Sequence, residues 1–220
     1  STSGFLLRRH DGSARPAADL GALVFQLEKA IIVAIQERRP ELLFLHAAAL
    51  ERDRAAWLFV GESGAGKSTT TWGLLHHGFS YLSDELAPIE LDTVEVLPYP
   101  HAHCLKRRPP PPYLLPAESL DLERTIHVPA RYLPSVSRLD PCALQAVFFV
   151  SQDARRRDPA LRRVSTAEAA ARLYVSTLNA LAHEARGLDA VLKVASHVSC
   201  FVLQAGDLES TCKLIAATDI

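Results

Sequence analysis

The segment that most constrains this chain runs from Leu58 to Thr70. Three apolar residues, Leu58, Phe59 and Val60, lead into the pattern G-x-x-x-x-G-K-S at Gly61–Ser68, and a helix-compatible stretch follows. A strand, a glycine-rich loop and a helix in this order are the setting that a phosphate-binding P-loop requires. The alternative, a plain glycine turn that happens to precede Lys-Ser, does not account for every motif position being filled.

The residue types in this segment suit a nucleotide. We expect the loop glycines to adopt positive φ and to let the backbone approach a phosphate closely. Backbone N–H groups and the positive end of the following helix would then hold the anion. Lys67 would reach the β- and γ-phosphates, and the Ser68 hydroxyl would bind Mg²⁺. We therefore predict ATP and Mg²⁺ as cofactors and the following nucleotide-binding residues: Gly61, Ser63, Gly64, Ala65, Gly66, Lys67, Ser68 and Thr69.

Composition limits the class of protein. The chain has 220 residues, of which 48% are hydrophobic and 22% charged, so residues 1–220 are predicted to form a single domain. A net charge of −1 argues against a nucleic-acid partner. The four cysteines show no C-x-x-C spacing, and no segment reads as a signal peptide or a membrane span, so we expect a cytoplasmic protein without a membrane partner. Whether copies of the chain form a homo-oligomer stays open.

The pattern of apolar residues predicts an α/β fold with a mixed, β-rich sheet flanked by helices. A helix is predicted over Asp19–Arg39, and Pro40 ends it. Leu42–Leu50 and Ala55–Val60 read as a β-hairpin whose second strand feeds the glycine-rich loop. The elements predicted after the loop are a strand at Phe79–Leu82, a hairpin at Leu86–Pro98, a strand at Leu144–Val150, helices from Ser165 and Leu188, a strand at His197–Gln204 and a last helix capped by Asp207.

An acidic pair, Asp84 and Glu85, follows the strand predicted at Phe79–Leu82. If that strand pairs beside the loop-bearing strand, its end reaches the edge of the sheet where ligands gather. One carboxylate could bind Mg²⁺ and the other could accept a proton or orient a water. A solvated acidic loop is the alternative. His46, between Leu45 and Ala47, would ordinarily be a core or edge residue, and the pattern alone favours that interpretation.

Other candidates are weaker. Asp153 follows an apolar strand and could replace Asp84 as a metal ligand. His101, His103 and Cys104 could form a metal cluster, but no second ligand pair at zinc spacing accompanies them. The basic run at 106–108 is ordinarily solvated, although near a phosphate site it could steer ATP or an acceptor. The proline-rich segment 107–116 is predicted to be an extended loop.

These residues together resemble the kinase domain of the HPr kinase/phosphorylase family, and more closely its short stand-alone relatives, which include kinases of lasso-peptide precursors. The likeness runs from about Leu43 to Ile89 and includes the glycine-rich loop, His46, the His77-Gly78-Phe79 segment and the acidic pair. It implies the HPr kinase / phosphoenolpyruvate carboxykinase-like variant of the fold. It also implies Asp84 as the base, Glu85 as a metal ligand with Ser68, and His46 beside the transferring phosphate. Glu85 departs from the family's usual Asp.

The sequence therefore predicts an ATP-dependent kinase that transfers the γ-phosphoryl group to a Ser or Thr hydroxyl of a peptide or small protein. Catalytic roles are expected for Asp84, His46 and Lys67. Two alternatives stay open: a nucleotide-gated binding module or ATPase switch, and a kinase for a small metabolite.

Overall fold

The computed structural model describes residues 4–8, 12–122, 125–136, 140–152, 156–183 and 187–220. Asp153, one of the weaker candidates, lies outside these ranges. The chain separates into two compact units, residues 1–40 and 41–220, and each is described by itself. None of the helices in the described parts of the chain has both the length and the apolar character needed to cross a bilayer.

The first unit is an antiparallel hairpin followed by one long helix. The hairpin pairs β1 (Phe5–Arg8) with β2 (Ala14–Ala17), and the helix is α1 (Leu20–Arg38). Asp19 caps the helix, because its carboxylate accepts a hydrogen bond from the Ala22 N–H at 2.7 Å. Several large apolar side chains of α1, including Phe25 and Ile31, remain exposed. These side chains of α1 thus form no buried core with the described residues of this unit.

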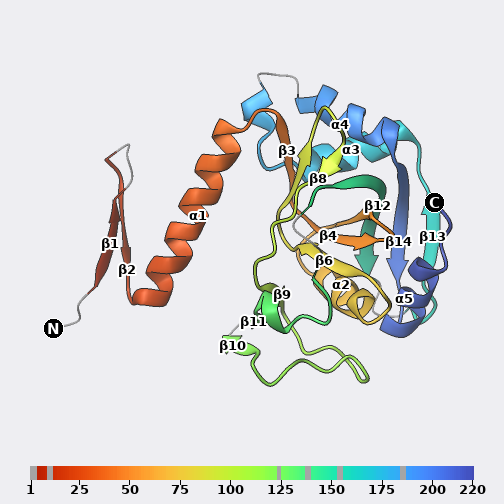
Figure 1. The fold of residues 1–220 in the computed structure, drawn as a ribbon, viewed down its shortest axis with the longest axis horizontal. Helices are drawn as coiled ribbons and strands as arrows, with labels where there is room; N and C mark the ends of the chain where they lie inside the picture. The colour runs from red at the N-terminus through yellow and green to blue at the C-terminus, as the bar shows by residue number, and fades with distance from the viewer. Residues whose placement is uncertain (1–3, 9–11, 123–124, 137–139, 153–155, 184–186) are drawn as a thin grey trace. The chain divides into compact units, whose positions relative to one another are not determined.

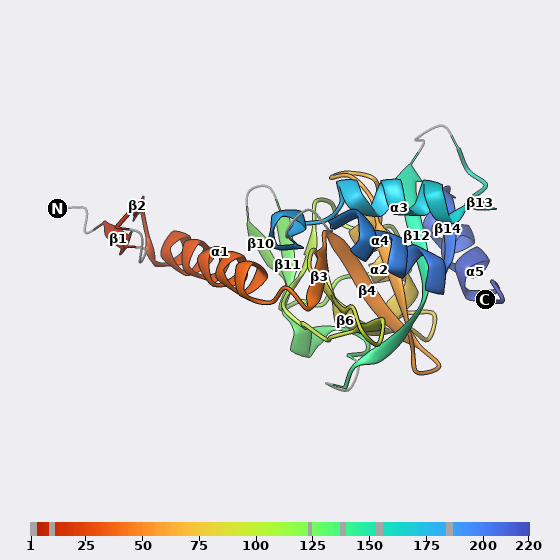
Figure 2. The same ribbon diagram turned by 90° about the horizontal axis from the view of Figure 1, so that it is seen from above.

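The second unit is built on a mixed, curled sheet (Figures 1 and 2). Its strands run in the order β3-β7-β8-β12-β5-β4-β6, with β14 beside β12 and β13 beside β14. Their bounds are β3 (Leu42–Leu45), β4 (Ala47–Arg52), β5 (Ala55–Val60), β6 (Ser80–Ser83), β7 (Ala87–Glu90), β8 (Glu95–Val96), β12 (Cys142–Gln152), β13 (Ala160–Arg163) and β14 (Ser199–Ala205). β12 is parallel to β5 and β14, whereas β4 is antiparallel to β5 and β6. The expected mixed α/β sheet is thus present.

Helices cover both faces of this sheet, and a separate hydrophobic core fills each side. On one face lie α3 (Thr166–Val175) and α4 (Gly187–His197), which pack on the first core through residues such as Leu173 and Val191. On the other lie α2 (Lys67–Leu75) and α5 (Leu208–Ala216), which bury Trp72 and Ile215 in the second core (Figure 1). A sheet covered on both faces explains why its central strands are almost entirely apolar.

A small second sheet lies beyond the main one in the order β10-β11-β9, with β9 at His103–Leu105, β10 at Leu120–Leu122 and β11 at Thr125–Val128. Short 3₁₀ turns occur at Ala130–Tyr132 and Ala180–His183. The proline-rich segment predicted as a loop connects β9 to β10 and contains no regular element. Of these strands, β9 is the one that reaches the glycine-rich loop region, because it carries His103 to the start of α2.

The hairpin predicted at Leu86–Pro98 is confirmed as the antiparallel pair β7–β8, and the hairpin predicted from Leu42–Leu50 and Ala55–Val60 is present as β4–β5. The segment Leu42–Leu50 is not a single strand, however, because it breaks at His46 and its first half, β3, pairs with β7. A second expectation needs correction: β6 pairs with β4 and not with the loop-bearing strand β5. Because β4 is antiparallel to both neighbours, β5 and β6 still point the same way. Their carboxyl ends therefore reach the same edge of the sheet, and the loop after β5 and the acidic pair after β6 meet there.

Candidate active site

A glycine-rich loop, Gly61–Gly66, connects β5 to α2. Gly64 and Gly66 have φ of 91° and 95°, which only glycine adopts easily. Gly61 does not have a positive φ, contrary to the expectation for all three loop glycines. A glycine is needed at this position because there is no room for a Cβ atom. A Cβ at Gly61 would lie 2.6 Å from the Val150 carbonyl oxygen, so the loop runs directly against β12.

The start of α2 is open to an anion. Within the described chain, no side chain caps this helix, and its first turn contains no acidic residue. The first N–H groups of a helix have no partner inside the helix, and its N-terminus carries partial positive charge. Ser68 and Thr69 lie in this turn and are half-buried, while Ser63 and Gly64 in the preceding loop are exposed. The segment therefore presents uncapped donors beside an accessible loop.

Lys67 reaches back from the first turn of α2 over the loop. Its Nζ donates to the Gly61 carbonyl oxygen at 2.9 Å and lies 3.3 Å from His46 Nε2. The residue is only 7% exposed. Burial lowers the pKa of Lys67, while the charges of Asp84 and Glu85 oppose that shift. The two carboxylates are thus close enough to act electrostatically on the loop lysine.

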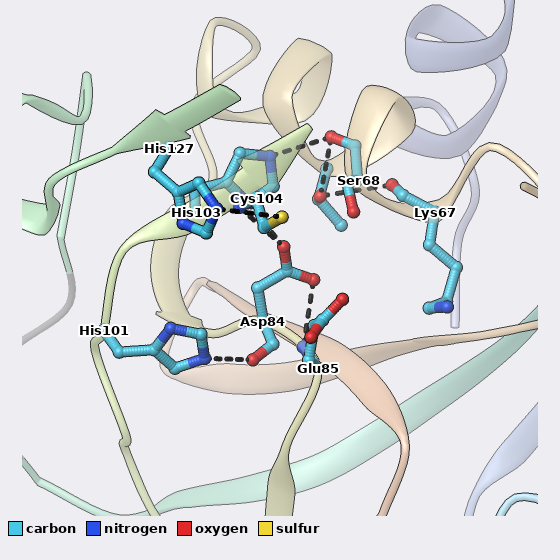
Figure 3. Close-up of polar contacts among 9 residues, drawn as sticks. Lys67, Ser68, Asp84, Glu85, His101, His103, Cys104 and His127 are labelled. Carbon is cyan, nitrogen blue, oxygen red and sulfur yellow. Dashed lines mark hydrogen bonds and ion pairs between the residues drawn. The ribbon is translucent and has the colours of Figure 1, made fainter. Parts of the chain in front are cut away.

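The acidic pair forms a tight turn between β6 and β7, here called the acid turn (Figure 3). Its two carboxylates differ in their surroundings. Asp84 is completely buried; its Oδ1 accepts from the Glu85 N–H at 3.0 Å, and its Oδ2 accepts from the Cys104 N–H at 3.2 Å. Glu85 is exposed and has a φ of 64°, a left-handed conformation that a non-glycine residue seldom adopts.

His46 connects the acid turn to the loop lysine. It lies in the break between β3 and β4, where its N–H donates to the Ser176 carbonyl oxygen at 2.8 Å. Its Nδ1 is 3.1 Å from the Glu85 carbonyl oxygen, and its Nε2 faces Lys67. The structure thus brings together the loop, Lys67, His46 and the acidic pair, which were singled out from separate parts of the sequence.

Two further histidines hold the acid turn, a role that the sequence pattern did not reveal. His103 is fully buried; its Nδ1 lies 3.0 Å from Asp84 Oδ2 and its Nε2 lies 2.9 Å from the Ser68 carbonyl oxygen. His101 Nε2 lies 2.5 Å from the Asp84 carbonyl oxygen. The spacing of the two histidines places them on the same side of an extended segment, but it does not show which groups they contact.

The surroundings of His103 also set the electrostatics of Asp84. Burial alone would raise the pKa of Asp84, but the His103 ring and the Cys104 N–H hold it below its usual value. The two atoms that the His103 ring nitrogens face, the Ser68 carbonyl oxygen and Asp84 Oδ2, are both acceptors. The neighbouring Cys104 thiol is half-buried, and burial raises its pKa to about 11.

The remaining candidates are placed as follows. His101, His103 and Cys104 form no metal cluster: the described residues contain no group of three or more His, Cys, Asp or Glu side chains arranged for a metal. From the basic run, Lys106 donates a hydrogen bond to Ser63 Oγ in the loop, whereas Arg108 pairs with Asp121 at 3.0 Å. Lys106 is thus the member of the run that reaches the loop.

Two cavities border the loop. The larger, of about 790 Å³, lies between Gly61–Ala65, the end of β12, and α3 with its C-terminal cap, where Arg172 and Ser176 line it. The smaller, of about 270 Å³, lies between Gly66, the first turn of α2 and residues Gly206–Leu208. Gln152 lines both cavities, so space for ligands is present on either side of the loop.

Comparisons with known proteins give a limited result. No protein-family model matches the chain, and no curated protein matches it. Among solved structures, the chain is similar to the HPr(Ser) kinase/phosphatase from Coxiella burnetii. The match covers 79% of this chain and 86% of the other, with 13% sequence identity and a TM-score of 0.39. A likeness of this degree assigns no activity to this chain.

Proposed function

We propose that this chain is an ATP-dependent kinase that transfers the γ-phosphoryl group to a Ser or Thr hydroxyl of a peptide or small protein. The observation that carries the proposal is the meeting of an uncapped helix start, a buried lysine and an acidic turn at one edge of the sheet. Lys67, His46 and Glu85 form a continuous chain of contacts across that edge. Phosphoryl transfer needs charge stabilisation and positioning more than covalent chemistry, and these groups supply both.

The residues present fit a magnesium-bound nucleotide. The uncapped N–H groups at the start of α2, and the preceding loop with its left-handed glycines Gly64 and Gly66, suit phosphate oxygens. The donor set for the metal consists of oxygens, the Ser68 hydroxyl and the Glu85 carboxylate, and oxygen is what Mg²⁺ prefers. When bound there, Mg²⁺ would neutralise charge on the phosphates. ATP and Mg²⁺ are therefore the proposed cofactors.

The side chains of the site then have distinct tasks. Lys67 stabilises the charge that develops on the γ-phosphate, and burial of its ammonium group makes that interaction stronger than it would be in water. His46 holds Lys67 and the acid turn at a fixed separation beside the transferring group. A carboxylate of the acid turn accepts the proton of the attacking hydroxyl.

The proposal of a polypeptide acceptor rests on the family resemblance and is supported by the surface beside the larger cavity. Val175 lines that cavity and is 84% exposed. Two more apolar side chains near the end of α3, Tyr174 and Leu178, are also exposed. Exposed apolar side chains close together in the chain are compatible with a surface that binds another polypeptide.

The test is transfer of radiolabel from the γ-phosphate of ATP, with Mg²⁺ present, to an arrayed library of Ser- and Thr-containing peptides. The Lys67→Ala variant is the negative control, and labelling should fall at least about 100-fold, in line with loss of a major charge-stabilising group. Labelled peptide from the wild type, absent with the variant, is the expected result.

Two other outcomes would replace the proposal. ATP consumption that gives only free phosphate, whatever peptide is supplied, would favour a nucleotide-gated switch. Label found on a small molecule of a cell extract, and on no polypeptide, would favour a metabolite kinase.

A further inference from the structure

The two carboxylates of the acid turn cannot have the same task, because the fold presents them differently. Asp84 is 0% exposed and Glu85 is exposed, although the residues are adjacent. Figure 3 shows the Asp84 carboxylate turned towards His103 and Cys104, while the Glu85 side chain extends on the side of Lys67. A group that meets a substrate must be reachable by it, so this difference separates a substrate-facing carboxylate from an internal one.

The Asp84 carboxylate is enclosed by protein. It accepts hydrogen bonds from the N–H groups of Glu85 and Cys104, and His103 Nδ1 lies 3.0 Å from Oδ2. Two carboxylate oxygens offer about four acceptor sites, and those that hold no hydrogen bond here face packed protein instead of solvent. A hydroxyl could reach Asp84 only if this buried arrangement opened, which would leave a charge unpaired in the interior at high cost.

The same contacts fix Glu85 in an uncommon conformation. A left-handed conformation is unfavourable for a non-glycine residue and persists only where its surroundings hold it. Here the Asp84 carboxylate accepts from the Glu85 N–H, His46 contacts the Glu85 carbonyl oxygen, and His101 contacts the Asp84 carbonyl oxygen. The turn is thus held from both sides in the shape that directs the Glu85 side chain outward.

His103 extends this support to the glycine-rich loop. Its two ring nitrogens contact Asp84 Oδ2 in the acid turn and the Ser68 carbonyl oxygen in the first turn of α2. One buried ring therefore fixes the distance between the acid turn and the helix start that would hold the phosphates. Neither Asp84 nor His103 needs to touch a substrate to exert this effect.

We propose that Glu85 is the carboxylate of the acid turn that touches the reacting groups, and that Asp84 and His103 are positioning residues. The inference rests on the proposed function. During transfer the acceptor oxygen forms a bond to the γ-phosphorus, the bond from that phosphorus to the bridging oxygen of ADP breaks, and the hydroxyl proton passes to the Glu85 carboxylate oxygen that would not be engaged with Mg²⁺. This arrangement departs from the assignment of the base to Asp84 that the family resemblance implies.

The experiment uses water as the acceptor, so that no partner has to be known. ADP formation from MgATP is measured for the wild type, Glu85→Gln, Glu85→Asp, Asp84→Asn, His103→Gln and the double variant of Asp84 and His103. Glu118→Gln, the same change at an exposed residue just after the proline-rich segment, is the matched control. Binding of a fluorescent ATP analogue and thermal unfolding are recorded alongside.

Glu85→Gln should lower kcat at least about 100-fold, the contribution expected of a general base, with an unchanged melting temperature because the residue is exposed. Glu85→Asp should retain more activity than Glu85→Gln. Asp84→Asn and His103→Gln should each lower the melting temperature and kcat, and their double variant should be at most about threefold slower than the slower single variant, because the two residues act as one unit.

Three results would overturn the inference: full activity in Glu85→Gln, a further loss of about 100-fold when Asp84→Asn is added to His103→Gln, or a wild type that forms no ADP. A wild type that shows the expected pattern but labels no polypeptide would refute the proposed kinase while leaving the division of roles in place.

Discussion

Replacing Gly61 with alanine tests how closely the glycine-rich loop depends on β12. The added Cβ would lie 2.6 Å from the Val150 carbonyl oxygen and 3.2 Å from Ala65 Cβ, whereas ordinary contacts begin at 3.4 Å. Neither backbone nor a neighbouring methyl group can rotate away, so the loop must move by most of an ångström. Overpacking of this kind costs about 1–3 kcal/mol, which corresponds to roughly 2–12 °C in the melting temperature of a chain of this size.

The functional consequence should exceed the loss of stability. A displacement of about 1 Å in a group that positions a substrate can cost about 100-fold in rate, and the Gly61 carbonyl oxygen also holds Lys67 Nζ. We expect Gly61→Ala to weaken MgATP binding at least about tenfold, as measured by isothermal titration calorimetry, and to lower the melting temperature measured by calorimetric scanning.

Gly78→Ala provides the matched control. Gly78 has a φ of 84°, and a Cβ added there would meet open space, so alanine costs only backbone strain, about 1–2 kcal/mol. It should therefore lose a comparable amount of stability and bind MgATP as the wild type does. Equal nucleotide affinity in Gly61→Ala and Gly78→Ala would refute the reasoning, because the loop would then tolerate a shift away from β12.

Contacts outside the acid turn lead to three more predictions. Lys106→Ala should weaken MgATP binding about three- to tenfold, because Lys106 contacts Ser63 in the loop. Arg108 is paired with Asp121 instead, so Arg108→Ala should leave the affinity measured by calorimetry unchanged. Equal losses of affinity in the two variants would show that only net charge matters. Asp207→Ala should lower the free energy of unfolding, measured in urea, by about 1 kcal/mol, because it removes the cap of α5. Hydrogen bonds from Ser210 lower the pKa of Asp207 in the folded chain. The difference in stability between wild type and variant should therefore be fully present above about pH 4, the ordinary aspartate range, and should vanish as the pH falls below the folded pKa. Burial raises the pKa of Cys104 to about 11 and that of Cys212 to about 12. Iodoacetamide at about pH 8 should therefore modify both thiols far more slowly than a free thiol, as followed by mass spectrometry. Rapid modification would contradict the burial of these two thiols.

The sequence predicted those parts of the fold whose signals are local. The hairpins, the cap at Asp207 and the glycine-rich loop each depend on residues close together in the chain, and the structure contains them all. The pairing of β6 with β4 was missed, because which strands become neighbours depends on the packing of the whole sheet.

The candidate site divides in the same way. Lys67, Asp84 and Glu85 were identified because their residue types sit beside a recognisable loop or strand end. The support that His103 gives to Asp84 and to Ser68 joins three elements that are distant in the sequence, and no periodicity reports such a contact. The burial of Asp84 could not be predicted either. Two adjacent acidic residues look equivalent in a sequence, and only the packing of the folded chain buries Asp84 while leaving Glu85 exposed.

A crystal structure of the chain with Mg²⁺ and a non-hydrolysable ATP analogue would test the proposed site most directly. We predict phosphates on Gly61–Gly66 and the first turn of α2, the γ-phosphate within reach of Lys67 Nζ, and the metal between Ser68 Oγ and the Glu85 carboxylate. A nucleotide bound elsewhere, or a metal held without either of these two oxygens, would contradict the proposal.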